Sequence, residues 1–126
     1  MKDFLISKTF NTPEVELLPS EGILRIEGRS IPEDPNGFYS PVIEKLDEYF
    51  ENPKELTQIN IKLEYINSGS SKYMLELLRT LKRFFDNGKN CIVNWYYEED
   101  DESIQELGQH YKNTIKIPFN LVDIID

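Results

Sequence analysis

The sequence predicts a single α/β domain over residues 1–126, with a mixed β-sheet whose helices lie mainly on one face. Strand-like segments alternate with helix-like segments in the second half of the chain, which favours right-handed crossovers and parallel strands. Two early strand-like segments flank the turn Glu21-Gly22, which favours an antiparallel hairpin. Polar residues at alternate positions of two strands indicate that helices cover the other face of the sheet poorly.

Composition and charge limit the class of protein. Of the 126 residues, 39% are hydrophobic and 12% aromatic, which is typical of a globular domain with a proper core. The chain has 14 basic and 23 acidic residues, and its net charge of −9 would repel nucleic acid and anionic lipid. We therefore expect no nucleic-acid or membrane partner, and favour protein partners that present a basic face.

The chain shows no targeting signal in its first residues and no long apolar run. Met1 to Phe4 lack the apolar region and the cleavage site of a signal peptide. No segment reaches the roughly 20 apolar residues of a membrane span. The single cysteine excludes an internal disulfide framework. We expect a cytoplasmic protein.

Three short strands are predicted in the first thirty residues. Phe4-Leu5-Ile6 is the first, and Thr12-Pro13-Glu14 interrupts it. Residues 16–18 can add a short paired strand. Residues 23–28 alternate, with Leu24 and Ile26 on one face of the predicted strand.

A first helix is predicted after an irregular segment. Residues 31–37 contain two prolines and a glycine, which argues against regular structure there. Ser40 is the expected N-cap and Pro41 the first helical residue. The helix ends at Asn52-Pro53. Its apolar stripe consists of Val42, Leu46, Tyr49 and Phe50.

The middle of the chain has the clearest pattern of strand, turn and helix. Residues 56–65 alternate between apolar and polar side chains, as in a half-buried strand. A helix is predicted from about Ser70 to Asp86, and Asn87-Gly88 is a typical stop with glycine as a left-handed C-cap. The residues of this helix that we expect to be buried are Met74, Leu77, Leu78, Leu81, Phe84 and Phe85.

The last third of the chain repeats this order. Residues 91–97 are predicted as a strand, residues 100–111 as an exposed helix, and residues 114–117 as a last strand. Residues 119–125 form an apolar tail, which we expect to pack against the domain.

The segment from Leu63 to Lys72 is the first candidate site. It is a strand-to-helix turn with several hydroxyl groups, and such a turn meets the unpaired N–H groups and positive dipole end of the next helix. A phosphate on Ser68 or Ser70 would enter that field and change the surface that a partner meets. In the structural alternative, Ser70 or Ser71 caps the helix and Gly69 supplies an unusual backbone angle.

Catalysis has little support in the sequence. His110 is the only histidine, and no nucleophile at a recognised spacing accompanies it. Cys91 lies in an apolar strand, which is typical of a buried structural thiol. We therefore expect no enzymatic activity and no cofactor.

The acidic segment 98–102 is the second candidate site. Its carboxylates can complement the dipole of the following helix, or gather Mg²⁺ or Ca²⁺, although the calcium-loop spacing with its turn glycine is absent. Trp95, Tyr96 and Tyr97 precede the segment and are the residue types that anchor protein interfaces. A small-molecule or divalent-metal site using residues 98–102 is thus the alternative function.

Three motifs occur in order along the chain. Residues 28–34 read Gly-Arg-Ser-Ile-Pro-Glu-Asp and residues 38–41 read Phe-Tyr-Ser-Pro. Residues 65–72 read Tyr-Ile-Asn-Ser-Gly-Ser-Ser-Lys, and residues 95–101 read Trp-Tyr-Tyr-Glu-Glu-Asp-Asp, followed by Glu106 and Gly108. These motifs resemble the Gly-Glu-Ser-x-Pro-Glu and Phe-Tyr-x-Pro, Tyr-x-Asn-Thr-x-Ser-Ser-Lys and Trp-Tyr-Tyr-Glu-x-Asp-Asp…Glu-x-Gly segments of the SiaC-type family, small bacterial regulatory phosphoproteins with a STAS-like fold. Arg29 stands in place of the family's glutamate, and Ser68 in place of its threonine.

This resemblance implies a phosphorylation switch, not an enzyme. A partner-switch serine/threonine kinase would phosphorylate Ser68, and a PP2C-type phosphatase would remove the phosphate. The unphosphorylated form would bind an effector, in one branch of the family a diguanylate cyclase. The residues that we expect to bind partners are Asn67, Gly69, Ser70, Ser71, Lys72, Trp95 and Tyr97.

Overall fold

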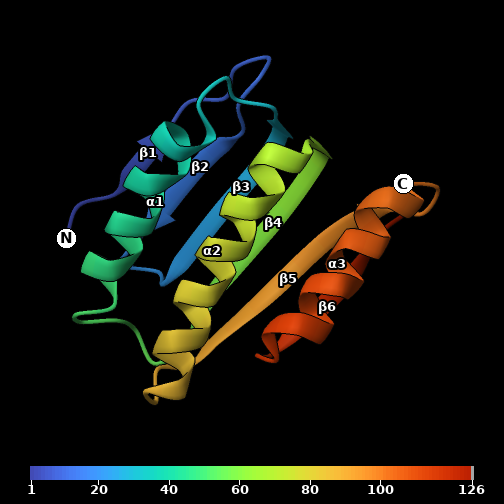
Figure 1. Ribbon diagram of the computed structural model, residues 1–126. Helices are drawn as coiled ribbons and strands as arrows, with labels where there is room; N and C mark the ends of the chain where they lie inside the picture. The colour runs from blue at the N-terminus through green and yellow to red at the C-terminus, as the bar shows by residue number, and fades with distance from the viewer. Residues whose placement is uncertain (126) are drawn as a thin grey trace.

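The computed structural model describes residues 1–125, which form one six-stranded sheet and three helices (Figure 1). The strands lie in the sheet in the order in which they occur in the chain. The elements are β1 (Phe4–Ile6), β2 (Glu14–Leu18), β3 (Ile23–Ser30), α1 (Pro35–Tyr49), β4 (Thr57–Ile66), α2 (Ser68–Asp86), β5 (Cys91–Glu98), α3 (Glu102–Ile115) and β6 (Phe119–Ile124).

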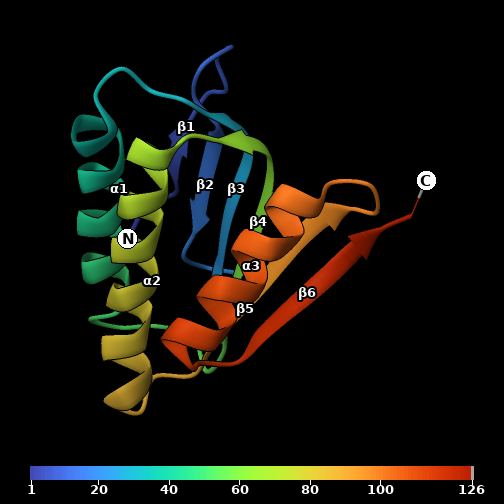
Figure 2. The same cartoon turned by 45° about the vertical axis from the view of Figure 1, so that its right-hand side comes forward.

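The sheet is mixed, as the sequence predicts. β1, β2 and β3 pair antiparallel, and β3, β4, β5 and β6 pair parallel. Each parallel pair is joined through one helix, and all three helices lie on the same face of the sheet (Figures 1 and 2). The predicted fold class is therefore confirmed, including the second face that no helix covers.

The hydrophobic core lies between the sheet and the three helices. Alternate residues of β2 to β5 point into it, because successive side chains of a strand point to opposite faces. Within residues 1–125, no helix combines the length and the apolar character needed to span a bilayer. The largest fully buried side chains are Trp95, Tyr39, Tyr111, Leu17, Leu24, Ile26, Leu46, Ile59, Ile61, Met74, Leu77 and Leu78.

The first helix begins earlier than the sequence predicts. Asp34 is its N-cap, and the Asp34 carboxylate accepts a hydrogen bond from the Gly37 N–H at 3.0 Å. Pro35 is the first helical residue, so the prediction of Ser40 and Pro41 in these roles is wrong. Asp34-Pro35 provides the same capping chemistry six residues earlier, and the exposed Pro41 lies inside the helix.

The last two elements also differ from the prediction. α3 continues to Ile115, and Lys116 ends it in the left-handed conformation with φ of 57°. The predicted strand at residues 114–117 is therefore wrong. The apolar tail packs against the domain as predicted, and it does so as β6, paired along β5. Backbone pairing with β5, which the local pattern does not reveal, decides this assignment.

Trp95 and Gly108 determine how closely α3 approaches the sheet. Trp95 on β5 is buried, and its Nε1–H donates to the Ile104 carbonyl oxygen at 2.9 Å. One turn later, a Cβ on Gly108 would lie 2.4 Å from a Trp95 ring carbon. Only a residue without a side chain allows this contact.

We predict that Gly108→Ala destabilises the domain by about 1–3 kcal/mol, because the methyl group must displace a packed indole ring. Gly69→Ala is the matched control, since the added Cβ would meet its nearest neighbours at an ordinary 3.7 Å. Urea unfolding of both variants measures the difference. Equal stabilities would show that α3 does not depend on the Trp95–Gly108 contact.

Candidate functional site

The candidate site lies at the edge of the sheet where the parallel strands end. β3, β4 and β5 end there, and α1, α2 and α3 begin beside them (Figure 2). Pro35 in the first turn of α1 would lie 3.7 Å from a Cβ on Gly69 in α2. The amino termini of α1 and α2 are therefore neighbours, and their unpaired N–H groups give this edge a positive partial charge.

Asn67, rather than Ser70 or Ser71, caps α2. The Asn67 side-chain oxygen accepts from the Ser70 N–H at 2.9 Å, and its backbone N–H donates to the Ser30 carbonyl at 3.2 Å. Gly69 is the second residue of the helix and does not have a positive φ, so the expected unusual angle is absent. The cap leaves Ser68 as the first helical residue, with its side chain exposed.

The predicted partner-binding residues divide by exposure. Lys72 is exposed like Ser68, and Asn67, Gly69, Ser71 and Tyr97 are half-buried. Ser70 and Trp95 are buried, so a partner docking on this fold cannot touch their side chains. This corrects the expectation for these two: Ser70 faces the core from α2, and Trp95 anchors α3.

Buried polar contacts lie directly beneath the turn. The hydroxyls of Ser30 and Tyr39 hydrogen-bond at 2.5 Å, joining β3 to α1. The Tyr111 hydroxyl donates to the Ser71 carbonyl at 2.8 Å, joining α3 to α2. Burial raises the pKa of Tyr39 to about 12, against a smaller opposing effect of its hydrogen bond with Ser30. The Tyr111 bond fixes the turn to α3, and the bond from the Asn67 N–H to the Ser30 carbonyl fixes it to β3.

The acidic segment 98–102 has a structural role at its end. The Asp101 carboxylate caps α3 by accepting from the Ile104 N–H at 3.1 Å, and Glu102 lies in the first helical turn. In residues 1–125, no three acidic, histidine or cysteine side chains converge in a manner that could hold a metal ion. The Asp101 cap and the position of Glu102 fit the helix-dipole interpretation of this segment.

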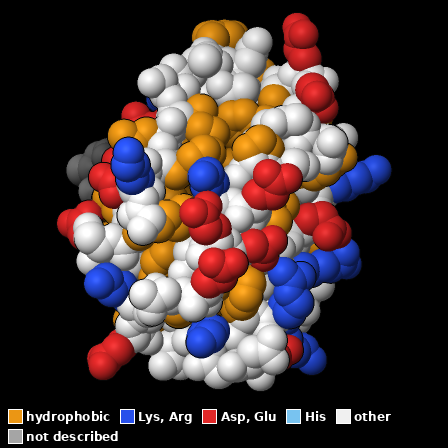
Figure 3. Space-filling model, turned by 90° about the vertical axis from the view of Figure 1, so that its left-hand side faces the viewer, with side chains coloured by type: hydrophobic (Ala, Val, Ile, Leu, Met, Phe, Trp, Pro, Cys, Tyr) orange, Lys and Arg blue, Asp and Glu red, His pale blue; other side chains and the backbone are white. Residues whose placement is uncertain are grey.

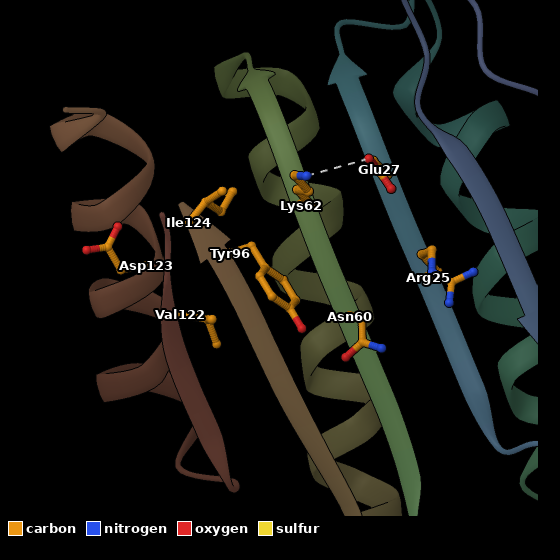
Figure 4. Close-up of a pocket in the computed structure, with 8 residues that line it drawn as sticks. All are labelled: Arg25, Glu27, Asn60, Lys62, Tyr96, Val122, Asp123 and Ile124. Carbon is orange, nitrogen blue, oxygen red and sulfur yellow. Dashed lines mark ion pairs between the residues drawn. The ribbon is translucent and has the colours of Figure 1, made fainter. Parts of the chain in front are cut away.

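The uncovered face of the sheet carries a shallow groove (Figure 4). Its charges are largely neutralised within the sheet, since Lys62 lies 3.9 Å from Glu27, and Arg25 lies 3.2 Å from Glu16. The groove is lined by Arg25, Glu27, Asn60, Lys62, Tyr96, Val122, Asp123 and Ile124. It offers a mixed surface with no convergent catalytic groups.

The two residues weighed for catalysis lie apart from this edge. Cys91 is buried at the start of β5, and burial raises the pKa of its thiol to about 11, which opposes thiolate formation. His110 is exposed on α3. Neither supplies a nucleophile–base pair.

The six-stranded mixed sheet with three helices on one face defines a small α/β domain, and a capped turn exposes a hydroxyl at one edge of its sheet. A family model described as SiaC family regulatory phosphoprotein matches residues 6–124. The chain belongs to the SiaC family of regulatory phosphoproteins.

Relatives and solved structures agree with this assignment. An uncharacterized protein of Pseudomonas aeruginosa strain UCBPP-PA14 is 25% identical over 119 residues, 94% of each chain. SiaC of Pseudomonas aeruginosa in complex with the diguanylate cyclase SiaD, which it activates, superposes with a TM-score of 0.91 at 24% identity, over 97% of this chain and 100% of that chain. Apo-SiaC gives a TM-score of 0.89 at 24% identity, over 97% and 99%. At this identity the superpositions show that the fold is shared.

Sequence reasoning missed the contribution of α1 to the site. Asp34 and Pro35 bring a second helix amino terminus beside the turn, and their capping pattern was present in the sequence. Tyr39 and Tyr111 were also missed, because the contacts of both with the turn region depend on tertiary packing.

We predict that Asn67→Ala lowers the free energy of unfolding by about 0.5–2 kcal/mol, because the cap of α2 is lost. Asn67→Asp is the control: it keeps the acceptor and adds a charge that the helix dipole favours, so its stability should match the parent. Chemical denaturation measures both. An alanine variant as stable as the aspartate variant would contradict the capping role.

We predict that Tyr39 makes the free energy of unfolding fall as the pH rises in the alkaline range. Its pKa rises from 10 to about 12 on folding, so its contribution is fully present below pH 10 and is lost as the pH rises through about 12. In Tyr39→Phe this loss should be smaller. At neutral pH that variant should also be about 1–3 kcal/mol less stable, because the buried Ser30 hydroxyl loses its partner. Urea unfolding between pH 8 and 12 tests both effects.

Proposed function

We propose that this protein is a non-enzymatic signalling switch that binds a diguanylate cyclase when unphosphorylated and releases it when Ser68 is phosphorylated. A partner-switch serine/threonine kinase would add the phosphate, and a PP2C-type phosphatase would remove it. The observation that carries the proposal is the exposed hydroxyl of Ser68 as the first residue of a capped helix.

The local chemistry supports reversible phosphorylation. A phosphate on Ser68 adds roughly −1.5 to −2 charges beside the amino terminus of α2, where helix N–H groups favour anions. The exposed Lys72 follows one turn later, the spacing at which side chains on a helix are neighbours. The folded domain can therefore accept the dianion without unfolding, and the change is confined to the surface that a partner meets.

The effect on a partner follows from charge and desolvation. A partner packed on a small neutral turn would have to desolvate the dianion, which is expensive unless cations pair with it. The chain already carries a net charge of −9, so an acidic region of a partner would be repelled further. Phosphorylation should therefore dissociate the complex.

The family supports the identity of the partner. The chain belongs to a family of regulatory phosphoproteins, and SiaC of Pseudomonas aeruginosa shares its fold and activates a diguanylate cyclase in a complex. We extend that partner class to this chain.

We predict that Ser68→Ala binds the cognate cyclase as tightly as the unphosphorylated parent and resists release by the kinase. Ser68→Asp should weaken binding only in part, because a carboxylate supplies at most one of the two phosphate charges. Both variants should stay within about 0.5 kcal/mol of the parent in stability, since the side chain is exposed. Calorimetry with the cyclase and intact mass after kinase treatment provide the measurements.

Ser20→Asp is the matched control, because Ser20 is also exposed but lies in the turn before β3, at the opposite end of that strand. It should bind like the parent. If Ser68→Asp binds no more weakly than Ser20→Asp, and no phosphate appears on Ser68, the turn is not the switch.

A further inference from the structure

Arg29 differs from the other arginines of this acidic chain. Arg25, Arg79 and Arg83 each form an ion pair with a carboxylate at 2.8–3.2 Å. Arg29 forms none with any acidic side chain in residues 1–125. A guanidinium in a protein of net charge −9 thus lies without a carboxylate partner near the end of β3.

Aromatic contact and burial fix the position of Arg29. Its guanidinium carbon lies 4.9 Å from the centre of the Phe10 ring, within the range of a cation–π interaction. Its Nε is buried and has no hydrogen-bond partner. The side chain is therefore partly desolvated and held in place, while no acceptor in the described chain uses that N–H group.

Exposed aromatic rings continue this surface. Phe10, in the loop between β1 and β2, is 75% exposed, and Tyr65 is 50% exposed. Arg29 and Tyr65 are paired residues of neighbouring strands. We call Phe10, Arg29 and Tyr65 the Arg29 patch. On the β1 side of the molecule, hydrophobic side chains reach the surface among acidic and basic ones (Figure 3).

The chemistry of the patch fits a protein segment with a carboxylate. Arginine presents a planar fork that pairs a carboxylate through two hydrogen bonds, and the ring beneath it limits its other orientations. Tyrosine, phenylalanine and arginine are the residue types enriched at the centres of protein interfaces. The groove of Figure 4 lacks this property, because its basic side chains already face glutamates.

The patch also borders the turn. Tyr65 precedes Ser68 by three residues, which span at most about 11 Å of chain. Exposed charges farther apart than the Debye length, about 8 Å at physiological ionic strength, are largely screened, so a dianion on Ser68 would repel a carboxylate bound at the patch only weakly there and more strongly at low salt. The turn and the patch are close enough for one partner to cover both.

We propose that the Arg29 patch is the docking surface for the diguanylate cyclase, and that it receives an apolar segment whose Asp or Glu side chain pairs with Arg29. The identity of the occupant rests on the proposed function. Phe10 and Tyr65 supply the apolar contact, and the Arg29 guanidinium supplies the specificity for a carboxylate.

The test is calorimetry of the full-length cognate cyclase with unphosphorylated protein. Arg29→Glu should weaken binding by about 30-fold or more, the effect of losing an interface hot spot and creating a like-charge contact. Phe10→Ala should weaken it by about fivefold or more. Arg79→Glu and Leu56→Ala are the matched controls, since they change an exposed arginine on α2 and an exposed leucine before β4, and both should bind like the parent.

Two further variants keep the test decisive. Arg29→Lys retains the positive charge without the planar guanidinium. It should fold like the parent and bind the cyclase with intermediate affinity. If circular dichroism shows that Arg29→Glu is unfolded, Arg29→Lys takes its place in the test. In the cyclase, one Asp→Arg or Glu→Arg substitution should restore binding to Arg29→Glu.

The outcomes separate the two proposals. If the parent binds the cyclase and the Arg29 variants bind equally well, the docking surface is elsewhere and the proposed function stands. If the parent binds and no charge reversal in the cyclase restores the binding of Arg29→Glu, the proposed pairing of Arg29 with a carboxylate of the cyclase is wrong. If the parent does not bind the cyclase at all, both proposals are wrong.

Discussion

The contact of Trp95 with Gly108 is the constraint on which the site depends. The Trp95 indole ring is buried beneath α3 and donates its N–H to the Ile104 carbonyl. The ring lies so close to Gly108 that a side chain at that position would clash with it. This places α3 so that Tyr111 packs against Trp95 and reaches the Ser71 carbonyl of α2. A residue at the centre of β5 thereby positions the first turns of α2, and with them Ser68.

The same edge gathers several helix amino termini because of the topology. Strands that run parallel end together, and each is followed by a helix on the same face. Asp34, Asn67 and Asp101 cap α1, α2 and α3 at this edge. Each cap satisfies some N–H groups of its helix, and the remaining ones make the edge favourable for an added anion. An exposed hydroxyl at the first position of α2 is therefore well placed for regulation by phosphate.

The sequence allowed the fold class and the core of the long elements to be predicted, because alternation in β4 and helical spacing in α2 are strong local signals. The sequence pattern did not separate two competing caps, because Ser40-Pro41 and Asp34-Pro35 are equivalent locally. In the structure Asp34-Pro35 begins α1, and Pro35 lies close to Gly69 at the start of α2. The sequence pattern also predicts Trp95 as a partner-binding residue, because nothing in the neighbouring residues indicates that its side chain is buried. Arg29 was noticed only as a departure from a motif, because its contact with Phe10 joins residues nineteen positions apart through the fold.

The open face of the sheet explains how a strongly acidic protein can still select partners by charge. Parallel strands are normally covered on both faces, and here the second face is kept soluble by ion pairs between β2, β3 and β4 and by linked asparagines across β4, β5 and β6. These pairs cancel most of its charge locally. Arg29, which forms no ion pair within residues 1–125, therefore differs electrostatically from the paired arginine and lysine of this face, and its strand partner Tyr65 lies three residues before Ser68. A dianion on Ser68 would lie at the same edge of the sheet as the proposed Arg29 patch, so recognition and its regulation would share that edge.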